Sequence, residues 1–206
     1  PLIHRYIEER NNNKQLTFVI GLQAYQGAGK TVLTTLMKHV FKELGFKMEG
    51  FAIDDFYKSD DDRTKLREII HPDNPFFKIS RGLPGTHRFA ELGEAIAQAK
   101  QGKFFEIPEF DKFLKDSRGD ISGSRKVNEQ QHFILLEGWC VGVPYVDGKD
   151  FETSMEKNSY VSKIFNELDP NKEHYKTVMN YVKEYQNIWS LIDHLTILQG
   201  KDIEWI

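Results

Sequence analysis

The chain has 206 residues, of which 39% are hydrophobic and 13% aromatic, and its 28 lysines and arginines nearly balance 31 aspartates and glutamates. This composition supports one domain with a sizeable core and excludes disordered and fibrous proteins. The formal net charge of −3 argues against a dedicated nucleic-acid binder, and the longest apolar runs are too short to span a membrane. Because Cys140 is the single cysteine, no internal disulfide can form, and a reducing, cytoplasmic compartment is expected.

Short apolar runs alternate with helical patterns from the start of the chain. Residues 2–7 predict a short amphipathic helix, and the continuous apolar run 16–22 predicts a strand buried on both faces. A glycine-rich turn then leads into a helix over 31–44, with Gly45 placed as its C-terminal cap. The residues expected to form the buried stripe of this helix are Leu33, Leu36, Met37, Val40 and Leu44.

The same alternation continues to the end of the chain. A strand is predicted over 48–53, and two excursions from the sheet, 59–86 and 108–128, are rich in polar residues and turn residues. The other predicted elements are a helical fragment at 65–70, a helix from Phe89 to near Gly102, strands over 104–107 and 132–137, a helical stripe from Tyr175 to Ile192, and a last strand over 195–198. Strands that alternate with helices predict a three-layer α/β fold with a mainly parallel sheet.

The strongest chemical signal lies between the first strand and the first long helix. Residues 24–31 match the phosphate-loop pattern G-x-x-x-x-G-K-[ST], except that Ala24 replaces the first glycine, which requires only a negative φ there. Gly27 and Gly29 allow backbone conformations that turn successive N–H groups toward a phosphate. Lys30 is expected to reach the β and γ phosphates. The predicted nucleotide-binding residues are Tyr25, Gln26, Gly27, Ala28, Gly29, Lys30, Thr31 and Val32.

Three carboxylates end predicted strands. Asp54 and Asp55 follow the strand at 48–53, and Glu137 ends the strand at 132–137. Because ligands of an open parallel sheet lie beyond the carboxyl ends of its strands, these side chains are expected beside the phosphate loop. Phosphoryl transfer needs one acidic group that holds or orients Mg²⁺ and one that accepts or aligns the proton of the attacking hydroxyl.

Further polar candidates lie in turn-rich strings at 82–88 and 108–112. A carboxylate-bearing acceptor would need cationic or N–H donors, whereas a nucleoside would need aromatic stacking. The candidate donors are His87, Arg88 and Lys112, and the candidate aromatic side chains are Tyr57, Phe110 and Phe113. The residues by themselves leave this choice open.

Five strings occur in a fixed order along the chain. They are the phosphate loop, Ile53-Asp-Asp-Phe-Tyr57, Gly82-Leu-Pro-Gly-Thr-His87, Pro108-Glu-Phe-Asp-Lys112 with Arg118-Gly-Asp120 behind it, and Leu136-Glu-Gly-Trp139. In this order, from residue 16 to the end, they resemble the glycerate kinase-like branch of the phosphate-loop (P-loop) kinases, which is related to uridine kinase, pantothenate kinase and phosphoribulokinase. The resemblance implies the P-loop nucleoside triphosphate hydrolase fold. It also implies a single kinase domain over 1–206 that continues past Ile206 into a helix and a lid arginine.

The resemblance further implies an ATP-dependent kinase of a small hydroxylated metabolite, most often D-glycerate, with ATP and Mg²⁺ as ligands. It assigns Asp54 as the catalytic base beside Lys30, and Thr31 and Glu137 as the residues that hold the metal. The residues expected to contact the acceptor are Asp55, Tyr57, His87, Arg88, Asp111 and Lys112. Neither nucleic acid nor a membrane is expected as a partner, and the monomer and the homodimer both stay open.

Three positions depart from the pattern of that branch: Arg88 stands where Asp is usual, Phe113 where Ser is usual, and Ile121 where Arg is usual. These departures and Ala24 motivate an alternative, an ATP-binding regulatory or interaction protein with little kinase activity. A kinase of pantothenate, a nucleoside or a sugar phosphate is a further alternative. Retention of the expected base and metal-binding residues argues against a mere binder, which has no need of a base.

Overall fold

The computed structural model describes residues 2–13, 17–70, 81–157 and 159–199. The elements are α1 (Leu2–Asn13), β1 (Phe18–Ala24), α2 (Lys30–Glu43), β2 (Met48–Ala52), the 3₁₀-helix η1 (Ile53–Phe56), α3 (Asp60–Ile70), α4 (Phe89–Lys100), β3 (Phe105–Asp111), α5 (Leu114–Ser117), β4 (Asp120–Val127), β5 (Phe133–Gly138), α6 (Gly148–Glu156), α7 (Ser159–Leu168), α8 (Glu173–Trp189) and β6 (His194–Leu198). Helices and strands alternate over most of the chain, as the sequence predicts.

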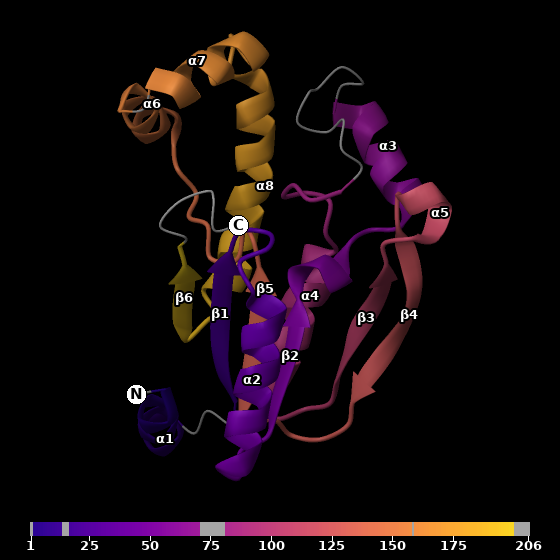
Figure 1. The fold of residues 1–206 in the computed structure, drawn as a ribbon, viewed down its shortest axis with the longest axis vertical. Helices are drawn as coiled ribbons and strands as arrows, with labels where there is room; N and C mark the ends of the chain where they lie inside the picture. Colours follow the sequence, from indigo (N-terminus) through magenta and orange to yellow (C-terminus); the bar gives the residue numbers. More distant parts are fainter. Residues whose placement is uncertain (1, 14–16, 71–80, 158, 200–206) are drawn as a thin grey trace.

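Four strands form a parallel sheet in the order β2–β5–β1–β6. The strand that precedes the phosphate loop, β1, lies in the middle, and its residue Leu22 pairs with Glu137 of β5. All four strands point toward the end of the molecule where α3, α5, α6 and α7 lie (Figure 1). The predicted α/β fold with a mainly parallel sheet is confirmed, and the carboxyl ends of β1, β2 and β5 lie side by side.

Each face of the sheet has its own apolar cluster, because successive side chains of a strand point to opposite faces. Phe18 and Ile20 of β1 pack with Phe41 of α2, whereas Val19 packs with the helices of the other face. That other cluster joins residues of α4, such as Ile96, to residues of α8. The sheet is therefore the middle of three layers, with α2 on one side and α4 and α8 on the other.

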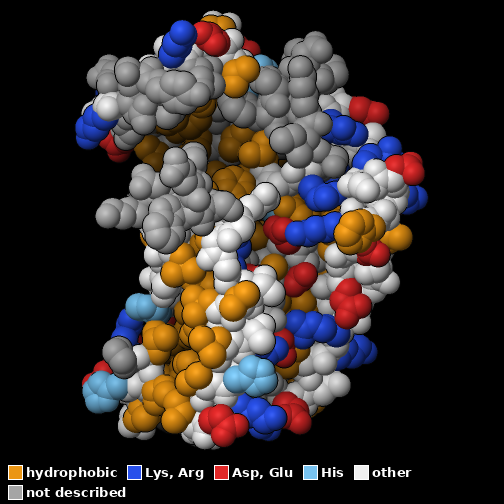
Figure 2. All heavy atoms as spheres, viewed as in Figure 1, with side chains coloured by type: hydrophobic (Ala, Val, Ile, Leu, Met, Phe, Trp, Pro, Cys, Tyr) orange, Lys and Arg blue, Asp and Glu red, His pale blue; other side chains and the backbone are white. Residues whose placement is uncertain are grey.

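The predicted buried stripe of α2 is wrong in part. Leu36, Val40 and Leu44 are exposed, whereas Thr34 is buried, and Figure 2 shows apolar side chains gathered on the surface over α2. The reason is a close approach between helix and strand: a Cβ atom built on Gly50 of β2 would lie only 2.7 Å from Cγ2 of Thr34. Because Gly50 has no side chain there, the helix rotates Thr34 toward the sheet.

The segment 108–128 contains regular structure that its polar sequence did not predict. β3 continues to Asp111 and pairs with β4 as an antiparallel hairpin, with a register shift between Glu109 and Phe110. Only one face of the hairpin is buried, and Ile107 and Val127 lie on that face. The polar residues of the other face make the alternation typical of a strand hard to recognise in the sequence. The hairpin stands beside the main sheet and carries α5 at its tip (Figure 1).

Other elements lie close to their predicted positions. Gly45 ends α2 with φ +81° and donates its N–H to the carbonyl of Lys42, so the predicted cap is confirmed. The helical fragment of the first excursion is longer than predicted, since α3 begins at Asp60, and residues 71–80 of that excursion lie outside the described residues. Within the described ranges, every helix is too short or too polar to cross a lipid bilayer.

Candidate active site

The phosphate loop adopts the geometry that its glycines predict. β1 ends at Ala24 in extended backbone, and the chain then turns through Gly27 and Gly29, whose φ angles are +80° and +82°. Gly29 is the N-terminal cap residue of α2, and its carbonyl accepts the N–H of Leu33. The positive end of the helix dipole and the free N–H groups of its first turn therefore lie at this loop, as an anionic phosphate requires.

Lys30, the first residue of α2, bends back over the loop. Its ammonium group donates hydrogen bonds to the carbonyls of Ala24 at 3.0 Å and of Tyr25 at 2.7 Å. An ammonium has three donors, so one remains for a ligand beside the loop. The side chain therefore both ties the loop to the end of β1 and brings a positive charge to the phosphate position.

Glu137 lies beside the loop because β5 pairs with β1. Its carboxylate accepts a hydrogen bond from Thr34 Oγ1 at 2.9 Å and a longer one from Thr31 Oγ1 at 3.4 Å. Two ligands on adjacent corners of an octahedral Mg²⁺ lie roughly 3 Å apart, so the Thr31 hydroxyl and the carboxylate can share one ion. The oxygen donors fit Mg²⁺, which keeps waters and phosphate oxygens in its other positions. Among the described residues no cluster of three or more His, Cys, Asp and Glu side chains forms a separate metal site.

Asp54 and Asp55 lie in η1, directly after β2, and have different surroundings. Asp55 Oδ2 accepts the N–H of Ala52 at 2.9 Å, and burial raises the pKa of this carboxyl. Asp54 is one quarter exposed and forms an ion pair with Lys112 at 2.8 Å. Burial raises the pKa of the nearby Tyr57 hydroxyl well above its usual range, and the negative charge of Asp54 acts in the same direction. Asp54 is thus the carboxylate that faces the open side of the site.

One cavity of about 790 Å³ joins these groups. Of the residues predicted from the sequence, it is lined by Gln26, Gly27, Lys30, Thr31, Asp54, Asp55, Tyr57, Lys112 and Glu137. The phosphate loop lines the cavity, and Phe110 and Lys112 of the β3–β4 hairpin line it as well. A nucleotide on the loop and a small acceptor near Asp54 fit in one continuous space.

Two predicted acceptor residues lie elsewhere. His87 is fully buried, with its ring stacked 4.5 Å from the ring of Tyr57 and its Nδ1 2.9 Å from the Tyr185 hydroxyl. Arg88 lines a second cavity, on the side of α4, where it pairs with Glu91 at 2.7 Å. Neither residue is in a position to contact an acceptor in the cavity described above. His87 instead packs its ring against the ring of Tyr57, which lines the cavity.

Several other predicted residues lie beside the cavity without lining it: Tyr25, Ala28, Gly29, Val32 and Asp111. Tyr25 and Val32 are exposed, and the carboxylate of Asp111 accepts the N–H of Phe113 in a local turn. The cavity also holds lining residues that the sequence did not single out by themselves, namely Arg81, Ser117 and Trp139. Trp139 belongs to the Glu-Gly-Trp string and donates its Nε1 hydrogen to the carbonyl of Gly82 at 2.8 Å, so it joins two of the five strings.

The burial of His87 gives a testable dependence of stability on pH. Burial lowers the pKa of His87 from 6.5 to about 3. Below pH 6.5 the unfolded chain therefore binds a proton at His87, whereas the folded protein does not. The free energy of unfolding therefore falls as the pH falls from 6.5, by up to about 1.4 kcal/mol per pH unit from this group. His87→Gln, which cannot take up the proton, should lose stability less steeply between pH 6.5 and 4.5 in urea titrations. Exposed His39→Gln is the control, and an unchanged slope in the His87 variant would contradict the assignment.

Comparisons with known proteins agree with this geometry. No family model matches the chain. It is 25% identical over 210 residues to the uncharacterized kinase mug58 of Schizosaccharomyces pombe, covering 99% of this chain and 72% of that protein. It is 33% identical over 131 residues to the chloroplastic D-glycerate 3-kinase of Arabidopsis thaliana, covering 60% of this chain and 28% of that protein.

The solved structure of D-glycerate 3-kinase from Cryptococcus neoformans superposes with a TM-score of 0.84 at 23% identity, covering 98% of this chain and 72% of that chain. A TM-score this high over nearly the whole chain establishes a common fold, and the aligned sequences of the other two proteins extend the similarity to kinases. The resemblance that the five strings predict is confirmed: the chain has the fold of the P-loop kinases and is related in sequence to D-glycerate 3-kinase and to other kinases.

Proposed function

We propose that this protein is an ATP-dependent kinase that transfers the γ-phosphoryl group of ATP to a hydroxyl of a small hydroxy acid, with D-glycerate as the first candidate. The observation that carries the proposal is the single cavity that joins the phosphate loop to the pair of Asp54 and Lys112. The names of the related kinases support the same acceptor. A kinase needs these two halves in one space, because the attacking hydroxyl must meet the γ-phosphorus in line.

The phosphate loop supplies the nucleotide half of this mechanism. Its N–H groups and Lys30 hold the β and γ phosphates, and the proposed ligands of Mg²⁺ are Thr31 and Glu137. When bound, Mg²⁺ neutralises charge on the β and γ phosphates. Thr34 fixes the orientation of Glu137 through the 2.9 Å hydrogen bond, so the carboxylate is held in place for the metal.

Asp54 supplies the acceptor half. Its carboxylate aligns the acceptor hydroxyl and takes up its proton as the oxygen attacks. The ion pair with the Lys112 ammonium holds the carboxylate and fixes the direction in which it points. Since the transition state of phosphoryl transfer is loose, this positioning contributes more than the basicity of the carboxylate.

The positions of the three sequence departures favour catalysis over a purely regulatory role. Phe113 is 85% exposed, and Arg88 and Ile121 line the second cavity. None of the three lines the cavity that joins the phosphate loop to Asp54. A chain that had lost transfer activity would be free to vary at Asp54 and Glu137, and both residues are kept.

The proposal also assigns a role to each part of the chain. Residues 1–206 belong to one kinase domain that continues past Ile206, and the excursions 59–86 and 108–128 contribute the acceptor side of the site. Gly82 of the first excursion and Lys112 of the second both line the cavity, which supports this assignment. A cytoplasmic location, expected from the single cysteine, stays a prediction.

A coupled assay of ADP release tests the proposal. The acceptors compared are D-glycerate, pantothenate, uridine and ribulose 5-phosphate, each with ATP and Mg²⁺. We expect turnover to be stimulated by D-glycerate well above the rate with ATP alone. Binding of ATP without stimulation by any acceptor would contradict kinase activity and favour the regulatory alternative. Stimulation by a different acceptor would keep the kinase and reject glycerate.

Glu137→Gln tests the proposed metal ligand. The variant keeps the size of the side chain and its hydrogen bond from Thr34 but removes the negative charge. We expect the Mg²⁺ concentration needed for half-maximal turnover to rise at least about tenfold, the scale of a weakened metal site. Glu129→Gln is the control, since Glu129 pairs with Lys47 on the surface. An unchanged Mg²⁺ requirement in the Glu137 variant would remove this residue from the metal site.

A further inference from the structure

The acceptor side of the cavity contains two cations, Lys112 and Arg81, in addition to Lys30 at the phosphate loop. Lys112 is already paired with Asp54 at 2.8 Å, so its charge is largely neutralised. Arg81 is the only arginine that lines the cavity among the described residues. Unlike Lys112, Arg81 forms no ion pair with a carboxylate of the described residues.

The backbone and side chain of Arg81 are held in place. Its Nη1 donates to the carbonyl of Ser117 at 2.8 Å, and the carbonyl of the next residue, Gly82, accepts the 2.8 Å hydrogen bond from Trp139. A guanidinium has five N–H donors, and among the described residues the bond to Ser117 uses one of them. A planar fork of this kind matches the two oxygens of a carboxylate.

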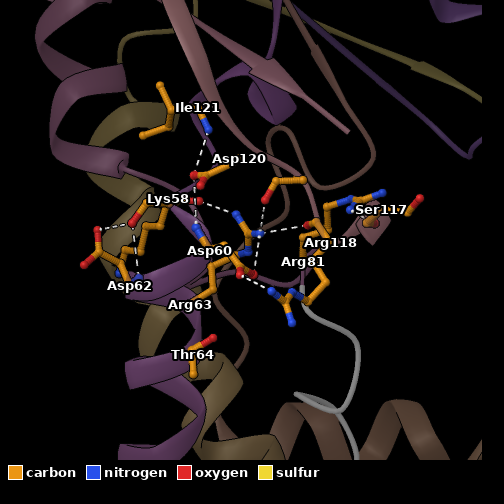
Figure 3. Close-up of polar contacts among 12 residues, drawn as sticks. Lys58, Asp60, Asp62, Arg63, Thr64, Arg81, Ser117, Arg118, Asp120 and Ile121 are labelled. Atoms are coloured by element: carbon orange, nitrogen blue, oxygen red, sulfur yellow. Dashed lines mark hydrogen bonds and ion pairs between the residues drawn. The ribbon is translucent and has the colours of Figure 1, made fainter. Parts of the chain in front are cut away.

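Asp60 pairs with arginines other than Arg81. Asp60 forms ion pairs with Arg118 at 2.9 Å and with the buried Arg63 at 3.5 Å. Arg63 also donates to the carbonyl of Gly119 and stacks over the ring of Phe110, which fixes the β3–β4 hairpin at the edge of the cavity. Figure 3 shows this connected cluster, with Arg81 at its border.

The electrostatic effects of Arg81 place its charge near the reacting groups. Burial lowers the pKa of Arg63, and the nearby positive charge of Arg81 acts in the same direction. Burial raises the pKa of Tyr57, and the charge of Arg81 opposes that rise. Tyr57, Asp54 and Arg81 all line the same cavity, so the charge of Arg81 acts within the space that the acceptor would enter.

We propose that Arg81 binds the carboxylate of the acceptor and thereby determines specificity for short hydroxy acids over neutral alcohols. The inference rests on the proposed kinase function and adds the residue that binds the carboxylate of the acceptor. It replaces His87 and Arg88, which the sequence suggested for this role and which lie outside the cavity. Asp54 and Arg81 line the same cavity, so an acceptor in it can place its hydroxyl at Asp54 and its carboxylate at Arg81.

The test compares Arg81→Met, Arg81→Lys and the wild type with D-glycerate and with glycerol, which has the same carbon chain but no carboxylate. We expect Arg81→Met to lower kcat/KM for D-glycerate roughly 10- to 100-fold, the scale of one or two charge-assisted hydrogen bonds. The value for glycerol should change less than about threefold, since glycerol has no group for the fork to hold. Arg81→Lys, which keeps the charge without the fork, should fall between the two.

Arg67→Met is the matched control, because Arg67 is also half-buried and lies on α3, outside the lining of the cavity. Affinity for ATP should be unchanged in every variant. Equal losses with D-glycerate and glycerol would show a merely structural role and overturn the proposal, as would a value for D-glycerate within twofold of the wild type.

Direct binding separates this proposal from the kinase function. Titration calorimetry with D-glycerate, in the presence of a non-hydrolysable ATP analogue, measures the carboxylate contact without turnover. Weaker binding to Arg81→Met than to the wild type would support the role of Arg81 even if the acceptor panel showed no transfer. Equal binding to both proteins, or no binding to the wild type, would overturn it.

Discussion

Asp54→Asn should lower turnover at least about 100-fold, the usual scale for loss of a general base, while affinity for ATP stays close to the wild-type value. Asparagine has the size of aspartate but cannot take up the proton of the acceptor hydroxyl. The ion pair with Lys112 is lost as well, but Asp54 is one quarter exposed and Lys112 about half exposed. Such a pair contributes at most about 1 kcal/mol to stability, so the variant should fold.

The measurements for this variant are the ADP-release rate at saturating D-glycerate and the dissociation constant for ATP. Asp61→Asn is the control, because Asp61 is exposed in the first turn of α3. Turnover within twofold of the wild type would contradict the proposed role of Asp54. A parallel loss of ATP binding would instead place Asp54 with the nucleotide.

The nucleotide half of the site could be predicted from the sequence because it depends on local rules. A turn with the Gly-x-Gly-Lys-Thr pattern between a buried parallel strand and a helix is typical of a phosphate loop. The place of Glu137 could be predicted because the end of one parallel strand lies beside the end of the next. For Glu137 only the parallel direction of the strands had to be assumed, and not the packing of individual side chains.

The acceptor half could not be predicted in the same way because long-range contacts determine it. A histidine is polar by type, and the burial of His87 depends on its stacking against Tyr57 and on the hydroxyl of Tyr185, from a helix about a hundred residues later. Arg81 carries no periodic signal in its loop, and its place in the cavity depends on Ser117 of the hairpin tip. The rotation of α2 depends likewise on Gly50, a residue of the next strand.

Lys30→Ala should weaken ATP binding about tenfold or more and lower turnover at least about 100-fold, because it removes a charge-assisted contact to the phosphates. The variant also loses the hydrogen bonds that the ammonium donates to the carbonyls of Ala24 and Tyr25, so the loop itself is held less firmly. Both effects act on the nucleotide, in contrast to the change at Asp54. Lys42→Ala, in the last turn of the same helix, is the control.

Thermal unfolding with and without ATP and Mg²⁺ distinguishes the two variants without any assumption about the acceptor. A ligand at 100 times its dissociation constant stabilises the folded state by about 2.7 kcal/mol, and a tenfold weaker site loses about half of that. Lys30→Ala should therefore show a clearly smaller nucleotide-induced rise in Tm, whereas Asp54→Asn should keep the full rise. A full rise in Lys30→Ala together with normal turnover would reject the phosphate loop as the ATP site. Loss of the rise in Lys30→Ala alone would separate nucleotide binding from proton transfer within one cavity.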